Sequence, residues 1–132
     1  MHDSKLVSLP IAAHFKLDDK LSQCTEEENE QMNNIPYSSA IGSLMYSMVS
    51  TRPDICFAMS VLSRFMSNPG KQHWEAVKWL FRYIKGTTNV GLIYEKKEEG
   101  TRLRLEGFVD VDYAGNLDNR KSTTTYMFCL ND

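Results

Sequence analysis

The sequence has few cysteines and no long apolar run. Its three cysteines, Cys24, Cys56 and Cys129, are an odd number at wide spacing, with no CxxC pair and no pair of nearby histidines. This pattern favours neither a disulfide framework nor a zinc site, and it indicates a reducing, intracellular setting, with cytoplasm and nucleus both left open. No apolar run approaches the roughly 18 residues of a membrane span, and the N-terminus lacks a signal-sequence pattern. The sequence therefore predicts a soluble protein with no membrane partner.

The net charge is also small, although the charges are unevenly distributed. The 132 residues carry a formal charge of −2, whereas residues 51–90 alone carry six basic and two acidic side chains. A small net charge argues against strong nucleic-acid binding by the chain as a whole. The basic middle segment keeps such binding open.

Hydrophobic periodicity divides the chain into a lead-in and a helical segment. Residues 1–35 contain the polar tract TEEENEQMNN and little periodicity, so we interpret them as an extended linker. Residues 36–89 predict three helices, from Pro36 to about Ser50, from TRPDI to SNPG, and from Lys71 to about Lys85. The expected inward positions are Ile41, Leu44, Met45, Met48, Ile55, Met59, Leu62, Phe65, Met66, Trp74, Val77, Leu80, Phe81 and Ile84.

Residues 90–132 have the texture of β-structure. The segments GLIYEK, RLRLEGFVDVD and STTTYMFCL predict three antiparallel strands in sequence order. The expected fold class is therefore α+β, with a small bundle of about three helices followed by an incomplete three-stranded antiparallel sheet.

The stretch VDVDYAG places two carboxylates, Asp110 and Asp112, on one face of the second predicted strand. Two like charges so close together repel, and such a pair persists most easily beside a cation, a loop or water. On the residues alone, solvated strand-end positions are the simpler interpretation, and a metal site is the alternative.

Several motifs occur in an order and spacing that resemble the copia-type retrotransposon Pol polyprotein. They are YSSAIGSLMY, TRPDI, HWEAVK and DNRKST. The resemblance covers almost the whole chain and corresponds to the region where reverse transcriptase passes into ribonuclease H. It implies that residues 36–89 are the helical end of the reverse transcriptase region. Residues 90–132 would then be the first strands of a truncated ribonuclease H-like domain.

The resemblance also implies a role for Asp110. The first aspartate of the family's D-A-D-W-A-G-D motif falls on this residue, which would then be a catalytic carboxylate and a ligand of Mg²⁺ in cleavage of an RNA/DNA hybrid. Asp112 stays open between a second metal ligand and a residue that holds the following turn. The family's other catalytic carboxylates fall outside this chain, so we expect the chain alone to bind Mg²⁺ poorly and to be catalytically inactive.

Two further functional classes remain open. The first is a non-catalytic nucleic-acid-binding remnant, in which Lys71, Lys78, Arg82 and Lys85 contact phosphates, with a solvated helix face as the simpler alternative. The second is a protein-interaction remnant that associates with itself through the open sheet. We interpret Trp74 and Trp79 as core or near-core residues, and His73 as structural or incidental.

Overall fold

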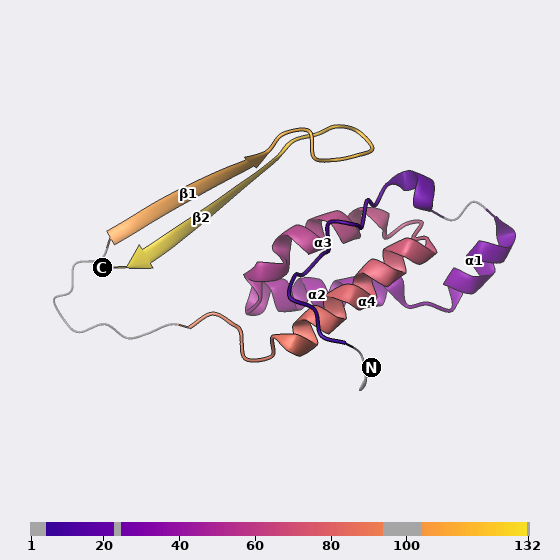
Figure 1. The fold of residues 1–132 in the computed structure, drawn as a ribbon, viewed down its shortest axis with the longest axis horizontal. Coiled ribbons are helices and arrows are strands. Elements are labelled where there is room, and N and C mark those ends of the chain that lie inside the picture. The colour runs from indigo at the N-terminus through magenta and orange to yellow at the C-terminus, as the bar shows by residue number, and fades with distance from the viewer. Residues whose placement is uncertain (1–4, 23–24, 94–103, 132) are drawn as a thin grey trace. The chain divides into compact units, whose positions relative to one another are not determined.

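Helices and strands are segregated along the chain in the computed structural model, which describes residues 5–22, 25–93 and 104–131. The chain divides into two units, Met1–Leu92 and Ile93–Asp132. The described part of the first unit is helical, and that of the second contains a two-stranded sheet (Figure 1). The α+β class is therefore confirmed.

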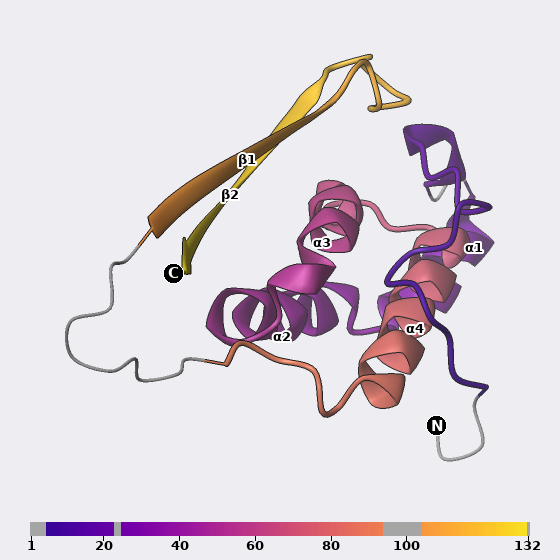
Figure 2. The same cartoon turned by 60° about the vertical axis from the view of Figure 1, so that its left-hand side comes forward.

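The three predicted helical segments form helices close to their expected bounds. They are α2 (Tyr37–Ser50), α3 (Cys56–Leu62) and α4 (Lys71–Gly86), and short 3₁₀ turns, η2 (Pro53–Ile55) and η3 (Ser63–Phe65), flank α3. Figure 2 shows the three helices packed around a common interior. In the described ranges, no helix combines the length and the apolarity needed to cross a membrane. The core consists of Leu17, Tyr37, Ile41, Leu44, Ile55, Ala58, Met59, Leu62, Phe65, Ala76, Val77, Leu80 and Tyr83.

Two of the residues expected to point inward are exposed. Met45 follows the buried Leu44 and so lies about 100° further round α2, where 41% of its surface is exposed. Met66 follows the last residue of η3 and is 38% exposed. The buried hydrophobic stripes are therefore narrower than those predicted from the sequence.

The lead-in contains a helix where the sequence pattern predicts extended chain. Helix α1 (Glu26–Asn33) begins at a capping box, in which the backbone N–H of Glu28 donates to Thr25 Oγ1 and the N–H of Thr25 donates to Glu28 Oε2. Three glutamates occupy the first turn, where the helix dipole favours negative charge. Because Met32 is the only buried residue of α1, hydrophobic periodicity does not reveal this helix.

The described residues before residue 23 run alongside α4, as the indigo segment in Figures 1 and 2 shows. The indole N–H of Trp79 donates to the carbonyl of Leu9 at 2.9 Å, and the Phe15 ring meets the same indole edge-on. The 3₁₀ turn η1 (Asp19–Leu21) follows, and Leu21 reaches the N-terminus of α4. A Cβ on Gly70 would collide with the carbonyl oxygen of Leu21, so the two backbones meet there.

The second unit contains an antiparallel hairpin of β1 (Arg104–Asp112) and β2 (Thr123–Asn131). The register runs without interruption from Arg104 opposite Asn131 to Asp112 opposite Thr123. These strands match two of the three predicted ones. Of the other predicted strand, residues 91–93 are not in a strand, and residues 94–96 lie outside the described residues.

Candidate functional site

The two candidate carboxylates lie at the end of β1, next to the loop that joins the strands. Asp110 is opposite Thr125 and Asp112 is opposite Thr123, so two threonines share the face that carries the aspartates. All four residues are exposed. The predicted placement of both aspartates on one strand face is confirmed.

The carboxylate of Asp112 is turned toward the loop. A Cβ on Gly115 would stand 2.8 Å from Asp112 Oδ1, 2.5 Å from its Cγ and closer still to Oδ2. The side chain therefore occupies the space that any residue larger than glycine would need at position 115. This placement favours the second of the two roles left open for Asp112, namely support of the turn.

The loop between the strands is built from its own hydrogen bonds. Asn116 Oδ1 accepts from the backbone N–H of Asp118 and of Asn119, and the Asn116 N–H donates to the carbonyl of Lys121. Ser122 Oγ accepts from the N–H of Ala114 at 3.1 Å. Ala114 and Arg120 adopt positive φ angles of 54° and 56°, a conformation that costs roughly 1–2 kcal/mol for a residue other than glycine. These hydrogen bonds offset that cost and define the loop conformation.

The hairpin carries residue types that suit Mg²⁺, but too few of them come together to form a site. Carboxylate and hydroxyl oxygens are the donors that Mg²⁺ prefers. Asp112 is directed at Gly115, however, and nowhere in the described ranges do three His, Cys, Asp or Glu side chains come together as a metal site requires. The described residues alone therefore do not fit a magnesium centre, and Asp110 could supply only one ligand of such a centre.

The four basic residues singled out by the sequence lie along α4, spaced by seven, four and three residues, which places them on one side of the helix. Lys71 and Lys85 are exposed. Lys78 Nζ forms an ion pair with Glu75 at 2.5 Å, and the Arg82 guanidinium lies 4.8 Å from the centre of the Trp79 indole. Lys78 and Arg82 thus already interact with neighbours on α4.

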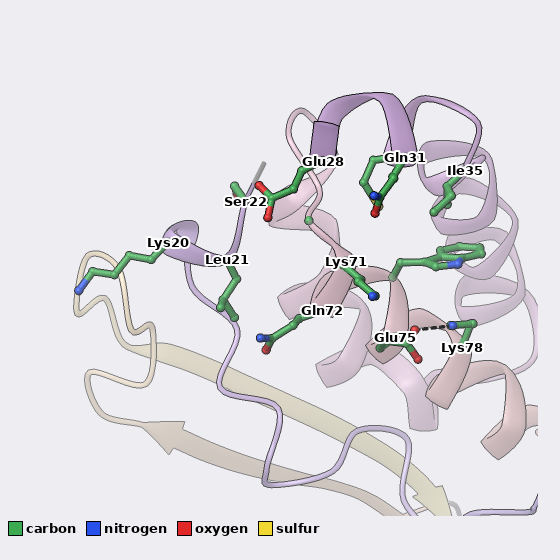
Figure 3. Close-up of a pocket in the computed structure, with 13 residues that line it drawn as sticks. Lys20, Leu21, Ser22, Glu28, Gln31, Ile35, Lys71, Gln72, Glu75 and Lys78 are labelled. Carbon is green, nitrogen blue, oxygen red and sulfur yellow. Dashed lines mark hydrogen bonds and ion pairs between the residues drawn. The ribbon is translucent and has the colours of Figure 1, made fainter. Parts of the chain in front are cut away.

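A groove of about 820 Å³ adjoins the first half of this basic stripe (Figure 3). Lys71, Glu75 and Lys78 line it from α4, and Glu28 and Gln31 line it from α1. Figure 3 shows side chains of both charges facing the groove from the two helices. Its mixed charge gives it no clear preference for an anion.

The TRPDI motif forms a polar network that the sequence patterns did not predict. Arg52 is 6% exposed and makes two hydrogen bonds to Asp54, and the Tyr83 hydroxyl donates to Asp54 Oδ2 at 2.9 Å. The Arg52 hydrogen bond lowers the pKa of Asp54, while Asp54 raises the pKa of Arg52. Burial, assisted by Asp54, raises the pKa of Tyr83. An arginine two residues before an aspartate, across a proline, is the sequence signal that could have suggested the pair.

The other polar and aromatic candidates have structural roles. His73 is fully buried, stacks on Phe65 with ring centres 4.0 Å apart, and accepts a hydrogen bond from the Gly70 N–H through Nδ1. Trp74 is half-buried against the core, and Trp79, also half-buried, contacts Leu9 and Phe15 of the lead-in. The near-core interpretation of Trp74 and the structural interpretation of His73 are confirmed.

Comparison with known proteins shows what the chain is similar to. The chain is 53% identical over 128 residues to the retrovirus-related Pol polyprotein from transposon TNT 1-94 of Nicotiana tabacum. It is 37% identical over 134 residues to the retrovirus-related Pol polyprotein from transposon RE1 of Arabidopsis thaliana. These matches cover 97% and 98% of this chain but only 9% and 8% of the two polyproteins. Along nearly its whole length the chain is therefore homologous to a short segment of retrovirus-related Pol polyproteins of transposons.

A shorter relative also matches. The chain is 46% identical over 100 residues to secreted RxLR effector protein 161 of Plasmopara viticola, and the match covers 76% of this chain and 68% of that protein. No protein-family model matches the chain, and no solved structure matches it.

Proposed function

We propose that this chain is the part of a retrotransposon Pol polyprotein in which the end of the reverse transcriptase region joins the first strands of a ribonuclease H-like domain. We further propose that the chain alone does not catalyse a reaction. The order of its motifs supports the first statement, together with the 53% identity to a Pol polyprotein along nearly the whole chain. In this proposal the β1–β2 hairpin belongs to a larger sheet, and the substrate of the parent polyprotein is an RNA/DNA hybrid.

The observation that carries the proposal is the placement of Asp110. This residue lies on an exposed strand face, where a phosphate or a metal ion could reach it, and its nearest acidic neighbour along the strand is directed into a turn. A two-metal centre shares several carboxylates between its ions. The remaining ligands would therefore have to come from polypeptide other than the described residues.

The experiment compares hybrid cleavage by the chain alone and by the same chain within a longer Pol segment. We expect no Mg²⁺-dependent cleavage by the chain alone, and cleavage by the longer segment that Asp110→Asn reduces by at least about 10²-fold. Asp118→Asn, in the adjoining loop, is the matched control and should retain activity. Cleavage by the chain alone, or full activity of the Asp110→Asn segment, would overturn the proposal.

A second candidate function is binding of a nucleic-acid duplex by α4. The observation in its favour is the stripe of Lys71, Lys78, Arg82 and Lys85 on one side of the helix. If phosphates are neutralised there, affinity falls steeply with salt, and each lost contact lowers the slope by roughly one. Lys71→Glu with Lys85→Glu should then abolish binding, whereas unchanged binding would exclude this surface.

A further inference from the structure

The chain does not leave the helical unit directly at the end of α4. Residues 87–91, which we name the exit segment, follow α4 and lie within the helical unit, which ends at Leu92. The Val90 N–H donates to the carbonyl of Thr87 at 3.0 Å, so the segment begins with a turn. Figure 2 shows the chain passing from the end of α4 toward α2 at this point. The exit segment therefore folds back on the unit that it leaves.

The exit segment meets the residues between α2 and η2 at two points. Thr87, at its beginning, accepts hydrogen bonds from Arg52. Gly91, at its end, lies against Thr51, since a Cβ on this glycine would stand 3.8 Å from the Thr51 carbonyl oxygen. Thr51 and Arg52 are adjacent in the TRPDI motif, so one short stretch contacts both ends of the exit segment.

Arg52 donates to both acceptors of Thr87. Its Nη1 donates to the Thr87 carbonyl at 3.1 Å, and its Nη2 donates to the Thr87 hydroxyl at 2.7 Å. The hydroxyl in turn donates to the carbonyl of Tyr83, in the last turn of α4, at 2.8 Å. The planar guanidinium carries its donors in a fixed fork, whereas the ammonium of lysine is a compact charge on a flexible stem. The geometry of the contact therefore suits arginine and not lysine.

The guanidinium is itself held in place. Arg52 is 6% exposed, and hydrogen bonds from its Nε and Nη2 to the Asp54 carboxylate fix the plane of the group. The central carbon of the guanidinium lies 5.6 Å from the centre of the Tyr83 ring, and the Tyr83 hydroxyl donates to Asp54. A donor group that is already ordered loses little conformational entropy when it binds a further partner. Arg52 is thus preorganised to hold Thr87.

We propose that Arg52 anchors the exit segment, so that the chain leaves the helical unit beside the turn between α2 and α3 and not along the axis of α4. The anchor is a conformational device that sets the point from which the following polypeptide starts. It uses residues of the helical unit and does not involve Asp110. The anchor and the proposed function can therefore fail independently.

Amide hydrogen exchange of the full chain, followed by NMR, tests the anchor. We expect the Val90 amide to be protected in the wild type, because its turn persists while Thr87 is held. Thr87→Val keeps the shape of the side chain but removes the hydroxyl, so the Val90 amide should exchange on the order of 10-fold faster. The Leu80 amide, inside α4, should exchange at the wild-type rate in the same variant.

Three further variants sharpen the comparison. Thr88→Val changes the neighbouring, exposed threonine and is the matched control, which should leave the protection of Val90 unchanged. Thr87→Ser keeps the hydroxyl and should retain the protection. Arg52→Lys loses the fork and should accelerate exchange at Val90 as Thr87→Val does.

The proposal is overturned if the Val90 amide is unprotected in the wild type, or if Thr87→Val and Thr88→Val have the same effect. Equal acceleration at Val90 and Leu80 also overturns it, because the contact would then support overall stability without anchoring the segment. A nuclear Overhauser contact between Gly91 and Thr51 should be present in the wild type and lost in Thr87→Val. Its absence from the wild type would equally overturn the proposal.

Discussion

The guanidinium group of Arg52 holds the carboxylate of Asp54 through two hydrogen bonds, from Nε to Oδ1 at 2.9 Å and from Nη2 to Oδ2 at 2.7 Å. The same guanidinium donates to the carbonyl and the hydroxyl of Thr87, which caps the C-terminus of α4. The last carbonyls of a helix have no hydrogen-bond partner within the helix. Arg52 supplies a donor to the Thr87 carbonyl at the end of α4 and, through Asp54, also holds the residues that directly precede α3.

Replacing Arg52 should therefore destabilise the helical unit. Arg52→Ala removes the ion pair and the cap together, and we expect the free energy of unfolding to fall by about 2–3 kcal/mol. Urea unfolding followed by tryptophan fluorescence measures this change. Arg64→Ala removes an exposed arginine of η3 and should alter stability by less than about 0.5 kcal/mol. A loss at Arg52 no larger than at Arg64 would contradict the role assigned to the network.

Stability should depend on pH through Asp54. The Arg52 hydrogen bond holds the pKa of this carboxyl below its ordinary value, so the folded state favours the ionised form. The resulting stabilisation is present above about pH 4, where the unfolded carboxyl is also ionised, and it is lost as pH falls through the lower folded pKa. Asp54→Asn should be less stable than the wild type at neutral pH, and the difference should shrink toward pH 3. A difference that stays constant between these pH values would exclude the linkage.

An alkaline transition should arise from Tyr37. Burial raises the pKa of this phenol, which is 2% exposed and donates to the carbonyl of Leu62 at 2.8 Å. Since the folded state favours the neutral phenol, stability is complete below the unfolded value of about 10 and decreases as pH rises through the raised folded pKa.

Tyr37→Phe tests this assignment. The variant should lose about 1 kcal/mol at neutral pH with the hydrogen bond, and it should show a shallower alkaline decrease than the wild type. Unfolding curves followed by circular dichroism at several pH values give the loss of stability at neutral pH and the steepness of its decrease at alkaline pH. Parallel alkaline curves for the two proteins would assign the transition to another group.

Two glycines should respond to alanine in opposite directions. A Cβ on Gly70 would collide with the carbonyl of Leu21, with the carbonyl carbon only 2.9 Å away, so Gly70→Ala should cost about 1–3 kcal/mol. A Cβ on Gly42 meets nothing within 4 Å inside α2, so Gly42→Ala should stabilise by about 0.5–1 kcal/mol. Thermal unfolding of the two variants provides the comparison, and a change of the same sign in both would refute it.

The contact between Asp112 and Gly115 can be measured with a double-mutant cycle. Gly115→Ala forces the Asp112 carboxylate to move, whereas in an Asp112→Ala background the space is already free. We expect the cost of Gly115→Ala to decrease by roughly 0.5 kcal/mol or more in that background. Equal costs in the two backgrounds would mean that Asp112 does not support the turn.

Local patterns of the sequence predict the helices and the strands of the hairpin well. The periodic stripes from Ile41 to Ile84 identify three helices because each buries one face, and the alternation around Val109 gives the strand faces. Helix α1 has no such stripe, since capping and charge define it, and periodicity therefore does not predict it.

The polar contacts of the candidate sites are harder to predict. Arg52 meets Thr87 across 35 residues of sequence, and no local pattern encodes that distance. The strand position of Asp110 follows from alternation, whereas the direction of the Asp112 carboxylate depends on a loop whose two positive φ angles fall on an alanine and an arginine. Sequence rules assign such angles to glycine and asparagine, so they do not anticipate this loop.

The hydrogen bond from Trp79 to Leu9 joins residues 70 positions apart. During synthesis Leu9 leaves the ribosome before Trp79, and the indole that donates to its carbonyl is made only after most of the helical unit. Closing so long a loop loses chain entropy before the hydrogen bond can stabilise the folded state. Leu9, which precedes Trp79 in the chain, therefore reaches its native position only after the residues of α4 are available.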